Sequence, residues 1–260
     1  MIYVCIPTFD EAGTIGPLLW KIRQVFAGFP REYQLLVAND ASSDPTAEIL
    51  APYAKVLPLV LLHHEARRGY AATAEELLRL ALERTDRPRR DCAILMQADF
   101  THPPEALPEL VKRIERGADL VVAEPTIRGQ PSRGVLWLRR GASAFLRRRV
   151  RVPGVRDVVA GFLAVRLSTL KAALPSGSGR LLTAEGWVAN AELLGRTAPF
   201  ARRVESVDVF ERHDLRPRAS RIDPWRAVRQ IWRERRRLDD LPRPRPPAPA
   251  QARQAPEAAS

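Results

Sequence analysis

Residues 94–105 read Ile94-Leu95-Met96-Gln97-Ala98-Asp99-Phe100-Thr101-His102-Pro103-Pro104-Glu105. Their three leading apolar residues predict a buried strand, and the polar residues Gln97 and Asp99 follow on either side of one small residue. Pro103 and Pro104 do not fit a continuing strand, so a turn and then a helix are expected. Because open α/β sheets bind ligands at the carboxyl ends of their strands, Asp99 is a candidate ligand-binding carboxylate. The alternative is a solvated strand end closed by an Asx turn.

Strand-like apolar segments alternate with helix-like segments over the first half of the chain. Strands are predicted at residues 2–6, 35–38, 56–62, 94–96 and 119–123, and helices at 15–25, 47–53, 70–83 and 104–114. The strands are almost uniformly apolar, which is typical of strands buried on both faces. The alternation therefore predicts an α/β fold, with a mostly parallel sheet and helices on both of its faces.

Polar clusters directly follow four of these strands. They occupy residues 8–11, 39–44, 67–69 and 97–101. Because the carboxyl ends of parallel strands meet at one edge of a sheet, we expect the four clusters to line a single cleft. This convergence favours a ligand-binding role for Asp99 over a solvated strand end.

The second half of the chain is less regular. We expect a helix at residues 131–150, a loop running into a strand at 157–165, a helix at 184–196, a strand at 204–210 and a basic loop at 211–221. A last amphipathic helix starts at Pro224, and the Pro-, Ala- and Arg-rich tail is expected to be disordered. These patterns divide the chain into a domain over residues 1–222, a basic helix over 223–240 and a tail over 241–260.

The amino-acid composition, above all its net charge, indicates which classes of binding partner suit this protein. The 260 residues suffice for one good-sized core or two small ones, and 45% of them are hydrophobic. The formal net charge is +12, and arginine supplies nearly all of the positive charge. Arginine favours phosphate-bearing partners such as nucleotides, nucleic acid or anionic lipid heads. A generally Arg-rich proteome is the alternative explanation for part of this excess.

The cysteines and the lengths of the apolar segments indicate the expected cellular location of the protein. Cys5 and Cys92 lie in predicted strands without metal-ligand spacing, so we expect buried thiols in a reducing compartment. No apolar run reaches the roughly 20 residues that cross a bilayer, and the first strand begins at Ile2, which leaves no room for a signal peptide. The expected location is cytoplasmic, including the inner face of the membrane as a peripheral protein.

Taken together, the segments resemble a known family. The chain is similar to family 2 glycosyltransferases with the GT-A fold, a Rossmann-like fold of nucleotide-diphospho-sugar transferases, and in particular to polyprenol-phosphate sugar transferases such as dolichol-phosphate mannosyltransferase. The likeness extends to about residue 225 and is carried by residues 6–11, 37–46, 68–69, 97–99, 102–105, 157–162, 192–194, 210–212 and 220–221. No single motif decides it, but their order and spacing are fairly specific.

The resemblance implies a set of residues around the nucleotide. These are Pro7, Thr8, Phe9, Glu11, Asn39, Asp40 and Arg68. Asn39 and Asp40 stand where the family places two aspartates that read the base and the ribose, and Arg68 would approach the nucleotide or its diphosphate. Further along the chain, Arg212, Ser220 and Arg221 match a basic loop that closes over phosphates.

Gln97, Ala98 and Asp99 occupy the family's Asp-x-Asp motif, which holds a divalent metal, Mg²⁺ or Mn²⁺, and the sugar-nucleotide diphosphate. Two carboxylates of the family pattern are carboxamides here, at Asn39 and Gln97. An amide oxygen still ligates Mg²⁺ or Mn²⁺ but brings no charge, so the metal is the part of the resemblance that these departures put in question. Asn39 still offers a donor and an acceptor to a base.

Asp157 matches an acidic residue near the sugar and the acceptor. A lipid phosphate acceptor is largely ionised near neutral pH, since its second pKa is about 6, and it needs no strong general base. A hydroxyl acceptor needs one, and Asp157 is then the candidate. The bland alternative is that Asp157 only caps the strand that follows it. Asp99 and Asp157 are thus the two candidate catalytic residues.

Three histidines and two Arg-rich helices lie outside the motifs described above. His102 is expected to cap the turn before Pro103, and His63 and His64 end a strand without metal spacing and are expected to have no role. The helices at 131–150 and 224–238 mix Trp and Leu with arginines, which suits an anionic membrane surface. Ordinary packing of an amphipathic helix against the domain explains the same pattern.

The sequence therefore predicts an inverting transferase that moves a hexose from a GDP- or UDP-sugar to a polyprenyl phosphate at the cytoplasmic face of a membrane. A second hypothesis keeps the fold and makes the acceptor a sugar or small-molecule hydroxyl. A third is a non-catalytic nucleotide-sugar binding protein that lost its metal, which Gln97 supports. A nucleic-acid binder ranks last, since no reading helix or aromatic platform is recognisable.

Overall fold

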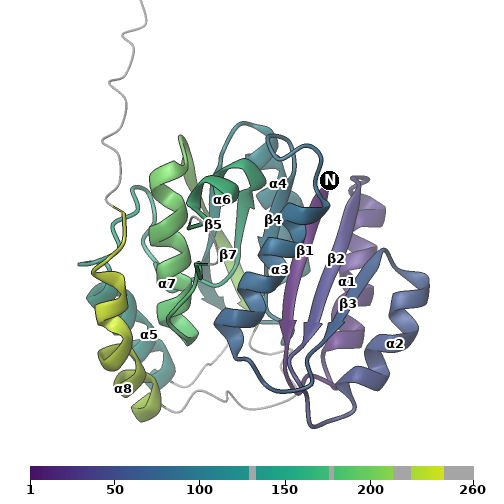
Figure 1. Ribbon diagram of the computed structural model, residues 1–260, viewed down its shortest axis with the longest axis horizontal. Coiled ribbons are helices and arrows are strands. Elements are labelled where there is room, and N and C mark those ends of the chain that lie inside the picture. Colours follow the sequence, from purple (N-terminus) through teal and green to yellow (C-terminus); the bar gives the residue numbers. More distant parts are fainter. Residues whose placement is uncertain (129–132, 176–178, 213–223, 243–260) are drawn as a thin grey trace, which may run out of the picture.

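The computed structural model describes residues 1–128, 133–175, 179–212 and 224–242. In this part of the chain one sheet runs through the molecule, with helices against both of its faces (Figure 1). Its strands are β1 (Ile2–Thr8), β2 (Tyr33–Asn39), β3 (Leu59–His63), β4 (Cys92–Leu95), β5 (Leu120–Arg128), β6 (Leu163–Arg166) and β7 (Val204–Arg212). They lie in the order β3-β2-β1-β4-β6-β5-β7.

Two separate cores hold the helices to the sheet. The helices are α1 (Ile15–Gly28), α2 (Thr46–Val56), α3 (Tyr70–Arg84), α4 (Leu107–Glu115), α5 (Arg133–Leu146), α6 (Leu167–Ala173), α7 (Gly186–Thr197) and α8 (Pro224–Glu234), with short 3-10 turns η1 (Pro104–Ala106), η2 (Ala198–Phe200) and η4 (Arg235–Leu238). Side chains alternate along β1, so Tyr3 and Cys5 join the core under α3, α6 and α7. Val4 and Ile6 join the core under α1, α2 and α4. The predicted α/β fold with helices on both faces is confirmed.

In the described sheet the carboxyl ends of six strands, all except β6, lie at one edge. β1 pairs in parallel with β2 and β4, and β2 pairs in parallel with β3. β6 is antiparallel to both β4 and β5, so β5 again runs in the direction of β4. The predicted convergence of the four polar clusters at one sheet edge is therefore confirmed, and the end of β5 joins them.

Several predicted boundaries are wrong. β3 begins at Leu59 rather than at residue 56, because α2 continues through Val56 and the Leu57 N–H donates to the Tyr53 carbonyl. β5 does not stop at residue 123 but continues to Arg128, since pairing with β7 supports its second half. The sequence pattern missed the short helix α6 altogether.

The two cysteines behave as expected. Cys5 in β1 and Cys92 in β4 are free and buried. Burial raises the pKa of both thiols, to about 12 for Cys92, so neither is a reactive thiolate. Both side chains therefore serve as small apolar residues of the two cores.

Candidate active site

The loop after each of the four parallel strands that carry the polar clusters contains a residue with positive φ. The φ angles are 50° at Asp10 after β1, 54° at Ala41 after β2, 91° at Gly69 after β3 and 62° at Phe100 near β4. Non-glycine residues rarely adopt this conformation, and such strain concentrates at functional sites. The conformations turn the loops sharply across one edge of the sheet, which is the candidate site.

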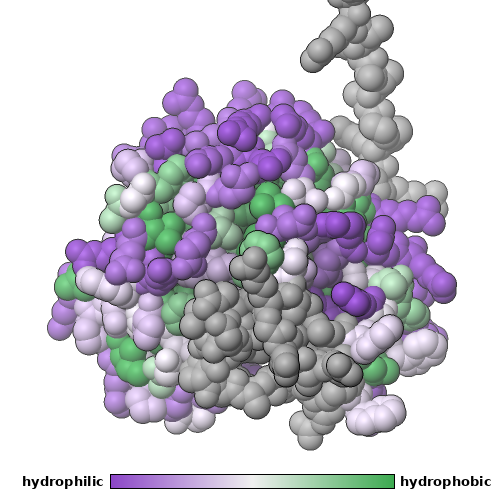
Figure 2. Space-filling view, turned by 180° about the vertical axis from the view of Figure 1, so that it is seen from behind, coloured by the Kyte–Doolittle hydropathy of each residue, from purple (hydrophilic) through white to green (hydrophobic). Residues whose placement is uncertain are grey.

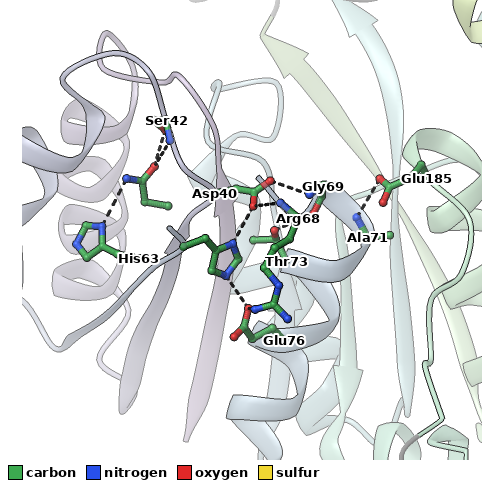
Figure 3. A network of polar contacts seen from close by, with 11 residues as sticks. Asp40, Ser42, His63, Arg68, Gly69, Ala71, Thr73, Glu76 and Glu185 are labelled. Carbon is green, nitrogen blue, oxygen red and sulfur yellow. Dashed lines mark hydrogen bonds and ion pairs between the residues drawn. The ribbon is translucent and has the colours of Figure 1, made fainter. Parts of the chain in front are cut away.

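Asp40 ties the β2 loop to the loop after β3 (Figure 3). Its side chain is buried, and its Oδ1 atom accepts hydrogen bonds from the Arg68 N–H at 2.8 Å and from His64 Nδ1 at 2.8 Å. Its Oδ2 atom accepts the Gly69 N–H at 2.9 Å. Both carboxylate oxygens are thus engaged within the protein, and Asp40 fixes the start of α3.

The pKa of Asp40 reflects this environment. Burial acts to raise the pKa of the carboxyl, but the hydrogen bonds from His64, Arg68 and Gly69 act against it and leave the pKa below its usual range. Asp40 is therefore ionised at neutral pH. A carboxylate that accepts several hydrogen bonds is stabilised as the charged form, which suits a fixed structural anion at this edge.

His64 is a residue whose role the sequence pattern missed. The prediction that it has no role is wrong, because its ring lies between two carboxylates: Nδ1 faces Asp40, and Nε2 lies 2.7 Å from Glu76 Oε2 (Figure 3). The same Glu76 oxygen accepts from Arg68 Nη1 at 2.9 Å. His64 and Glu76 therefore orient Arg68, the arginine expected to approach a nucleotide. No local signal marks them, since Glu76 is 12 residues away on α3.

The β1 and β2 loops are joined to each other. Asn39 Oδ1 accepts from the Ser42 hydroxyl and N–H, and its Nδ2 atom lies 3.5 Å from His63 Nδ1. Asp10 Oδ1 accepts the Ser43 N–H at 2.7 Å, and the Asp10 N–H donates to the Ser42 hydroxyl. Asn39 and Asp40 are thus both placed at the expected edge, where their side chains hold loops together. Contact of either with a base or ribose stays a prediction.

The predicted nucleotide-bordering residues of β1 lie at this edge as well. Thr8 and Glu11 are buried, and Glu11 Oε2 accepts from the Thr14 hydroxyl at 2.8 Å. Pro7 is half-buried. The Arg67 guanidinium lies 3.7 Å from the ring centre of the half-buried Phe9, across the gap between the β1 and β3 loops. This flat pair is suited to stacking on a base, and the sequence pattern did not single out Arg67.

Glu185 is a further acidic residue that the sequence pattern missed. It precedes α7, and its Oε2 atom accepts the Ala71 N–H at 3.2 Å in the first turn of α3 (Figure 3). Burial, the largest cause, raises the pKa of Glu185, and the neighbouring carboxylates of Glu234 and Asp40 raise it further. A Cβ atom at Gly69 would lie only 2.8 Å from Glu185 Oε1, so this close approach requires glycine.

The segment after β4 forms the floor of the edge. Asp99 is buried, and its Oδ1 atom accepts hydrogen bonds from the N–H and hydroxyl of Thr101. Gln97 is partly exposed, and its Oε1 atom lies 3.3 Å from the same hydroxyl, while Ala98 is buried in the core. His102 Nδ1 accepts the Gln97 N–H at 3.0 Å and its ring stacks on Phe162, so its predicted structural role is supported.

The oxygen atoms of Gln97 and Asp99 fit a divalent metal only in a limited way. Within the described ranges, no group of three or more His, Cys, Asp and Glu side chains is arranged to hold a metal ion. Mg²⁺ and Mn²⁺ sites commonly use one or two carboxylates and take their other ligands from phosphates and water. Asp99 with Gln97 therefore fits a metal that arrives with a diphosphate, and does not form a closed protein cage.

A cavity of about 510 Å³ lies beside the second half of β5 and the middle of β7, against α5. Its walls carry Glu124, Arg139, Arg140, Ser143, Arg147, Arg156, Asp157 and Asp208. Asp157 Oδ2 accepts from Arg139 Nε at 3.1 Å, and its Oδ1 atom accepts the Val159 N–H at 3.1 Å, so Asp157 also caps the turn before β6. The predicted residue Asp157 is thus at the sheet edge, bonded to an arginine of α5.

The structure describes only residues 211 and 212 of the basic loop predicted at residues 211–221. Arg212 ends β7, and its backbone pairs with Arg128. Ser220 and Arg221 lie outside the described residues, as does most of the predicted loop. Closure of this loop over phosphates stays a prediction.

A comparison with models of protein families identifies the family of the chain. The model of "Glycosyl transferase family 2" matches residues 3–173, which include every strand end of the site except that of β7. The chain belongs to glycosyl transferase family 2. The family predicted from the sequence motifs is thereby confirmed.

Named relatives in this family have related activities. The chain is 26% identical over 170 residues to a dolichol-phosphate mannosyltransferase of Pyrococcus furiosus, covering 64% of this chain and 46% of that one. It is 28% identical to an undecaprenyl-phosphate 4-deoxy-4-formamido-L-arabinose transferase of Edwardsiella ictaluri, covering 66% and 51%. It is 27% identical to an undecaprenyl-phosphate mannosyltransferase of Micrococcus luteus, covering 80% and 82%. The chain thus spans about half the length of the first two relatives and most of the third.

Solved structures of similar shape support the GT-A fold. A glucosyl-3-phosphoglycerate synthase from Mycobacterium tuberculosis, in complex with Mn²⁺, UDP-glucose and glycerol 3-phosphate, has a TM-score of 0.62 at 20% identity and covers 94% of this chain and 81% of that one. A mycobacterial protein has a TM-score of 0.64 at 19% identity, covering 94% and 76%. At these identities the likeness shows the shared fold.

Proposed function

We propose that this member of family 2 transfers a hexose from a nucleotide diphosphate sugar to a polyprenyl phosphate, with inversion at the anomeric carbon. The observation that carries the proposal is the arginine-lined cavity at the same sheet edge as Asp99. A transferase of this kind needs two anion sites at one edge, one for the donor diphosphate and one for the acceptor phosphate. The relatives named for transfer to dolichol phosphate and undecaprenyl phosphate support the same acceptor class.

The charges of the cavity favour a phosphate ligand. Arg139 is bonded to Asp157, and Arg156 is bonded to Glu124 and Asp208. Arg140 and Arg147 also line the cavity, and neither pairs with a carboxylate within the described part of the chain. Arg140 lies on α5 and Arg147 directly follows its last residue, Leu146, so both reach the cavity from the same segment of the chain. Two arginines that no described carboxylate neutralises offer forked donors to a phosphate.

Asp157 is less suited to a hydroxyl acceptor. Its two carboxylate oxygens already accept hydrogen bonds from Arg139 and from the Val159 N–H. A general base has to reach the proton that it removes, so this arrangement favours an acceptor that is ionised before it binds. A phosphate monoester meets that condition near neutral pH. In the proposal Asp157 holds Arg139 toward the acceptor.

The donor would bind across the β1, β2 and β4 ends. Phe9 and Arg67 would flank the base, and Arg68, oriented by Glu76, would approach the diphosphate. A divalent metal held by Asp99 and Gln97 would neutralise charge on the departing diphosphate. The protein residues fix the donor and acceptor so that the acceptor oxygen lies in line with the anomeric carbon.

A second acceptor class shares the cavity chemistry. A small phosphorylated molecule would also place its phosphate on Arg140 and Arg147 and attack through a hydroxyl. The structural neighbour named glucosyl-3-phosphoglycerate synthase is the observation that favours it. The two candidates differ in the nucleophile, since the lipid uses its phosphate oxygen and the small molecule a hydroxyl.

The test is a transfer assay with the full chain, in which release of the nucleoside diphosphate is followed for GDP- and UDP-hexoses. Each donor is combined with a polyprenyl phosphate, a phosphorylated small acceptor or no acceptor, with Mn²⁺ or with a chelator. The proposal predicts acceptor-dependent release with the polyprenyl phosphate and a glycosylated lipid as product. Release only with the small acceptor supports the second candidate. No release with any donor contradicts both and supports a binding protein.

A further inference from the structure

We propose that the outward face of α8, with the adjoining turn η4, docks on an anionic lipid bilayer. The docking surface is formed by Trp225, Val228, Arg229, Trp232 and Arg236. Its meaning for catalysis rests on the proposed transfer to a polyprenyl phosphate, because that acceptor is itself embedded in a bilayer.

Helix α8 has two apolar sides, of which one is buried in the protein and the other is largely exposed, although Trp232 on the exposed side also contacts Phe145. Ile231 is buried in the core shared with α7, and Glu234 on the same side is buried as well. On the other side, Trp225 is 84% exposed, Trp232 is 61% exposed and Val228 is 47% exposed. Positions 225, 228 and 232 follow the spacing of one helix face. Packing against the domain buries Ile231 but leaves most of the Trp225 and Trp232 side chains exposed.

Arginines border the exposed apolar stripe. Arg229 lies between the two tryptophans on the helix surface, and Arg233, Arg236 and Arg237 are exposed. The Arg235 guanidinium lies 3.5 Å from the ring centre of Trp232. Among residues 224–238 the one acidic side chain is Glu234, which is turned inward. Tryptophan beside arginine is the composition that binds at the boundary between lipid headgroups and acyl chains.

The positive charge of the docking surface favours an anionic bilayer over a second copy of this chain as its binding partner. A second copy of this chain would bring the same arginines and another net charge of +12 against the surface, which disfavours pairing of two such faces. An anionic lipid leaflet supplies the opposite charge to the arginines and an apolar layer to the tryptophans. The surface therefore suits a bilayer better than another copy of this chain.

Contacts of α8 place this surface beside the candidate active site. Glu234 accepts the Glu185 N–H at 2.7 Å, and Glu185 in turn accepts the Ala71 N–H at the start of α3. Trp232 stacks on Phe145 of α5, and the two helices lie side by side (Figure 1). Arg140 lies on α5, and Arg147 directly follows it. A bilayer on the outer face of α8 would therefore lie close to the arginine-lined cavity.

The experiment is flotation of the full chain with vesicles of phosphatidylcholine alone or mixed with phosphatidylglycerol. We expect binding to the mixed vesicles that weakens as salt is raised, and much less binding to phosphatidylcholine. The double variant Trp225→Ala/Trp232→Ala should bind the mixed vesicles about tenfold more weakly or worse. Its matched control is Trp20→Ala, which removes a tryptophan that is 48% exposed on α1, away from α8, and should leave binding unchanged.

A charge pair of variants tests the arginines. Arg229→Glu/Arg236→Glu should lose the preference for mixed vesicles, whereas Arg90→Glu, in the loop before β4 at the opposite sheet edge, should keep most of it. Circular dichroism and urea unfolding identify any variant that fails to fold, and the other pair then carries the test. Wild-type protein that floats with neither vesicle overturns the proposal. So does a tryptophan variant that floats like wild type, or one that loses self-association in sedimentation instead.

The failure of docking and the failure of the proposed function are distinguishable. If both hold, the tryptophan variant keeps transfer to a water-soluble short-chain polyprenyl phosphate and loses transfer to a long-chain acceptor in vesicles. If wild-type protein binds mixed vesicles but glycosylates neither acceptor, docking stands and the proposed function fails. If it glycosylates the short-chain acceptor without binding vesicles, the function stands and docking fails.

Discussion

The imidazole of His64 and the carboxylate of Asp40 meet through a 2.8 Å contact between Nδ1 and Oδ1, although 24 residues separate them in the chain. Glu76 faces the other ring nitrogen, at 2.7 Å. The contact joins the ends of β2 and β3 to the start of α3. It places Arg67 and Arg68 at the sheet edge where the donor is proposed to bind, so changes here should affect both stability and donor binding.

The first prediction concerns Asp40. Its pKa in the folded state is lowered below the value of about 3.9 expected when unfolded, so its stabilising effect is present above that value and is lost as pH falls through the folded pKa. Asp40→Asn should lower the free energy of unfolding by about 1–3 kcal/mol at neutral pH. Urea unfolding at neutral pH and at about pH 3 should show this difference shrinking in acid.

The matched control is Asp86→Asn, since Asp86 is 84% exposed and pairs only with its neighbour Arg87 within the described residues. It should change the unfolding free energy by less than about 0.5 kcal/mol. An Asp40→Asn protein as stable as this control at neutral pH would contradict the role assigned to the carboxylate.

The second prediction concerns Glu185, whose pKa shift has the opposite sign. Burial raises its folded pKa above the unfolded value of about 4.3, so the folded state binds the proton more tightly. Wild-type stability should therefore decline as pH rises from the unfolded to the folded pKa of this group. Glu185→Gln should remove this decline and leave the protein equally or more stable near pH 7, by about 0.5–1 kcal/mol. Thermal unfolding over a pH series measures both effects, and an unchanged pH profile would count against the assignment.

The third prediction concerns Gly69, which has φ of 91° directly before α3. Gly69→Ala should cost about 1–3 kcal/mol, because alanine is strained at this φ and its Cβ would lie 2.8 Å from Glu185 Oε1. The double variant Gly69→Ala/Glu185→Ala should recover only the part due to the close contact. Gly28→Ala is the control, since nothing lies within 4 Å of a Cβ there. Equal losses for Gly69→Ala and Gly28→Ala in urea unfolding would refute the strain.

The fourth prediction concerns the metal. Calorimetry of GDP and UDP should show tighter binding with Mn²⁺ than with a chelator, because the Asp99 carboxylate and the diphosphate would share the ion. Asp99→Asn should abolish this difference, and Gln97→Asp should enlarge it by about tenfold, since it adds a second charge. Affinities that do not respond to Mn²⁺ in wild type or in Gln97→Asp would exclude a diphosphate-linked metal at this pair.

The fifth prediction concerns the cavity arginines. Arg140→Ala/Arg147→Ala should lower kcat/KM for a polyprenyl phosphate by about 10- to 100-fold, as expected for the loss of charged hydrogen bonds to a phosphate. Binding of the nucleotide donor should be unchanged, because the donor is expected at the β1, β2 and β4 ends. Arg90→Ala is the matched control. Loss of donor binding in the double variant, or retention of acceptor kinetics, would contradict an acceptor role for this cavity.

The sequence predicted the fold well where the pattern is local. Apolar runs followed by polar turn residues marked the positions of β1, β2 and β4, because parallel strands are buried on both faces. The start of β4 was missed, since it begins at Cys92 rather than at residue 94. Boundaries that depend on neighbours were missed: β5 continues to Arg128 through pairing with β7, and α2 continues past Pro52 to Val56. Pairing and packing supply these hydrogen bonds and contacts, and neither is visible in a local window.

By itself, the sequence determined the α/β class, the order of strands and helices in the first half of the chain, and the gathering of residues such as Asn39, Asp40 and Asp99 at one sheet edge. These follow from hydrophobic periodicity and from the common direction of parallel strands. Only the tertiary structure decided what those side chains touch. Asp40 bonds to His64, Asp157 bonds to Arg139, and Glu185 reaches α3, each across at least 18 residues of chain. Such pairs arise when distant elements pack together, so their chemistry is set by the fold rather than by any motif.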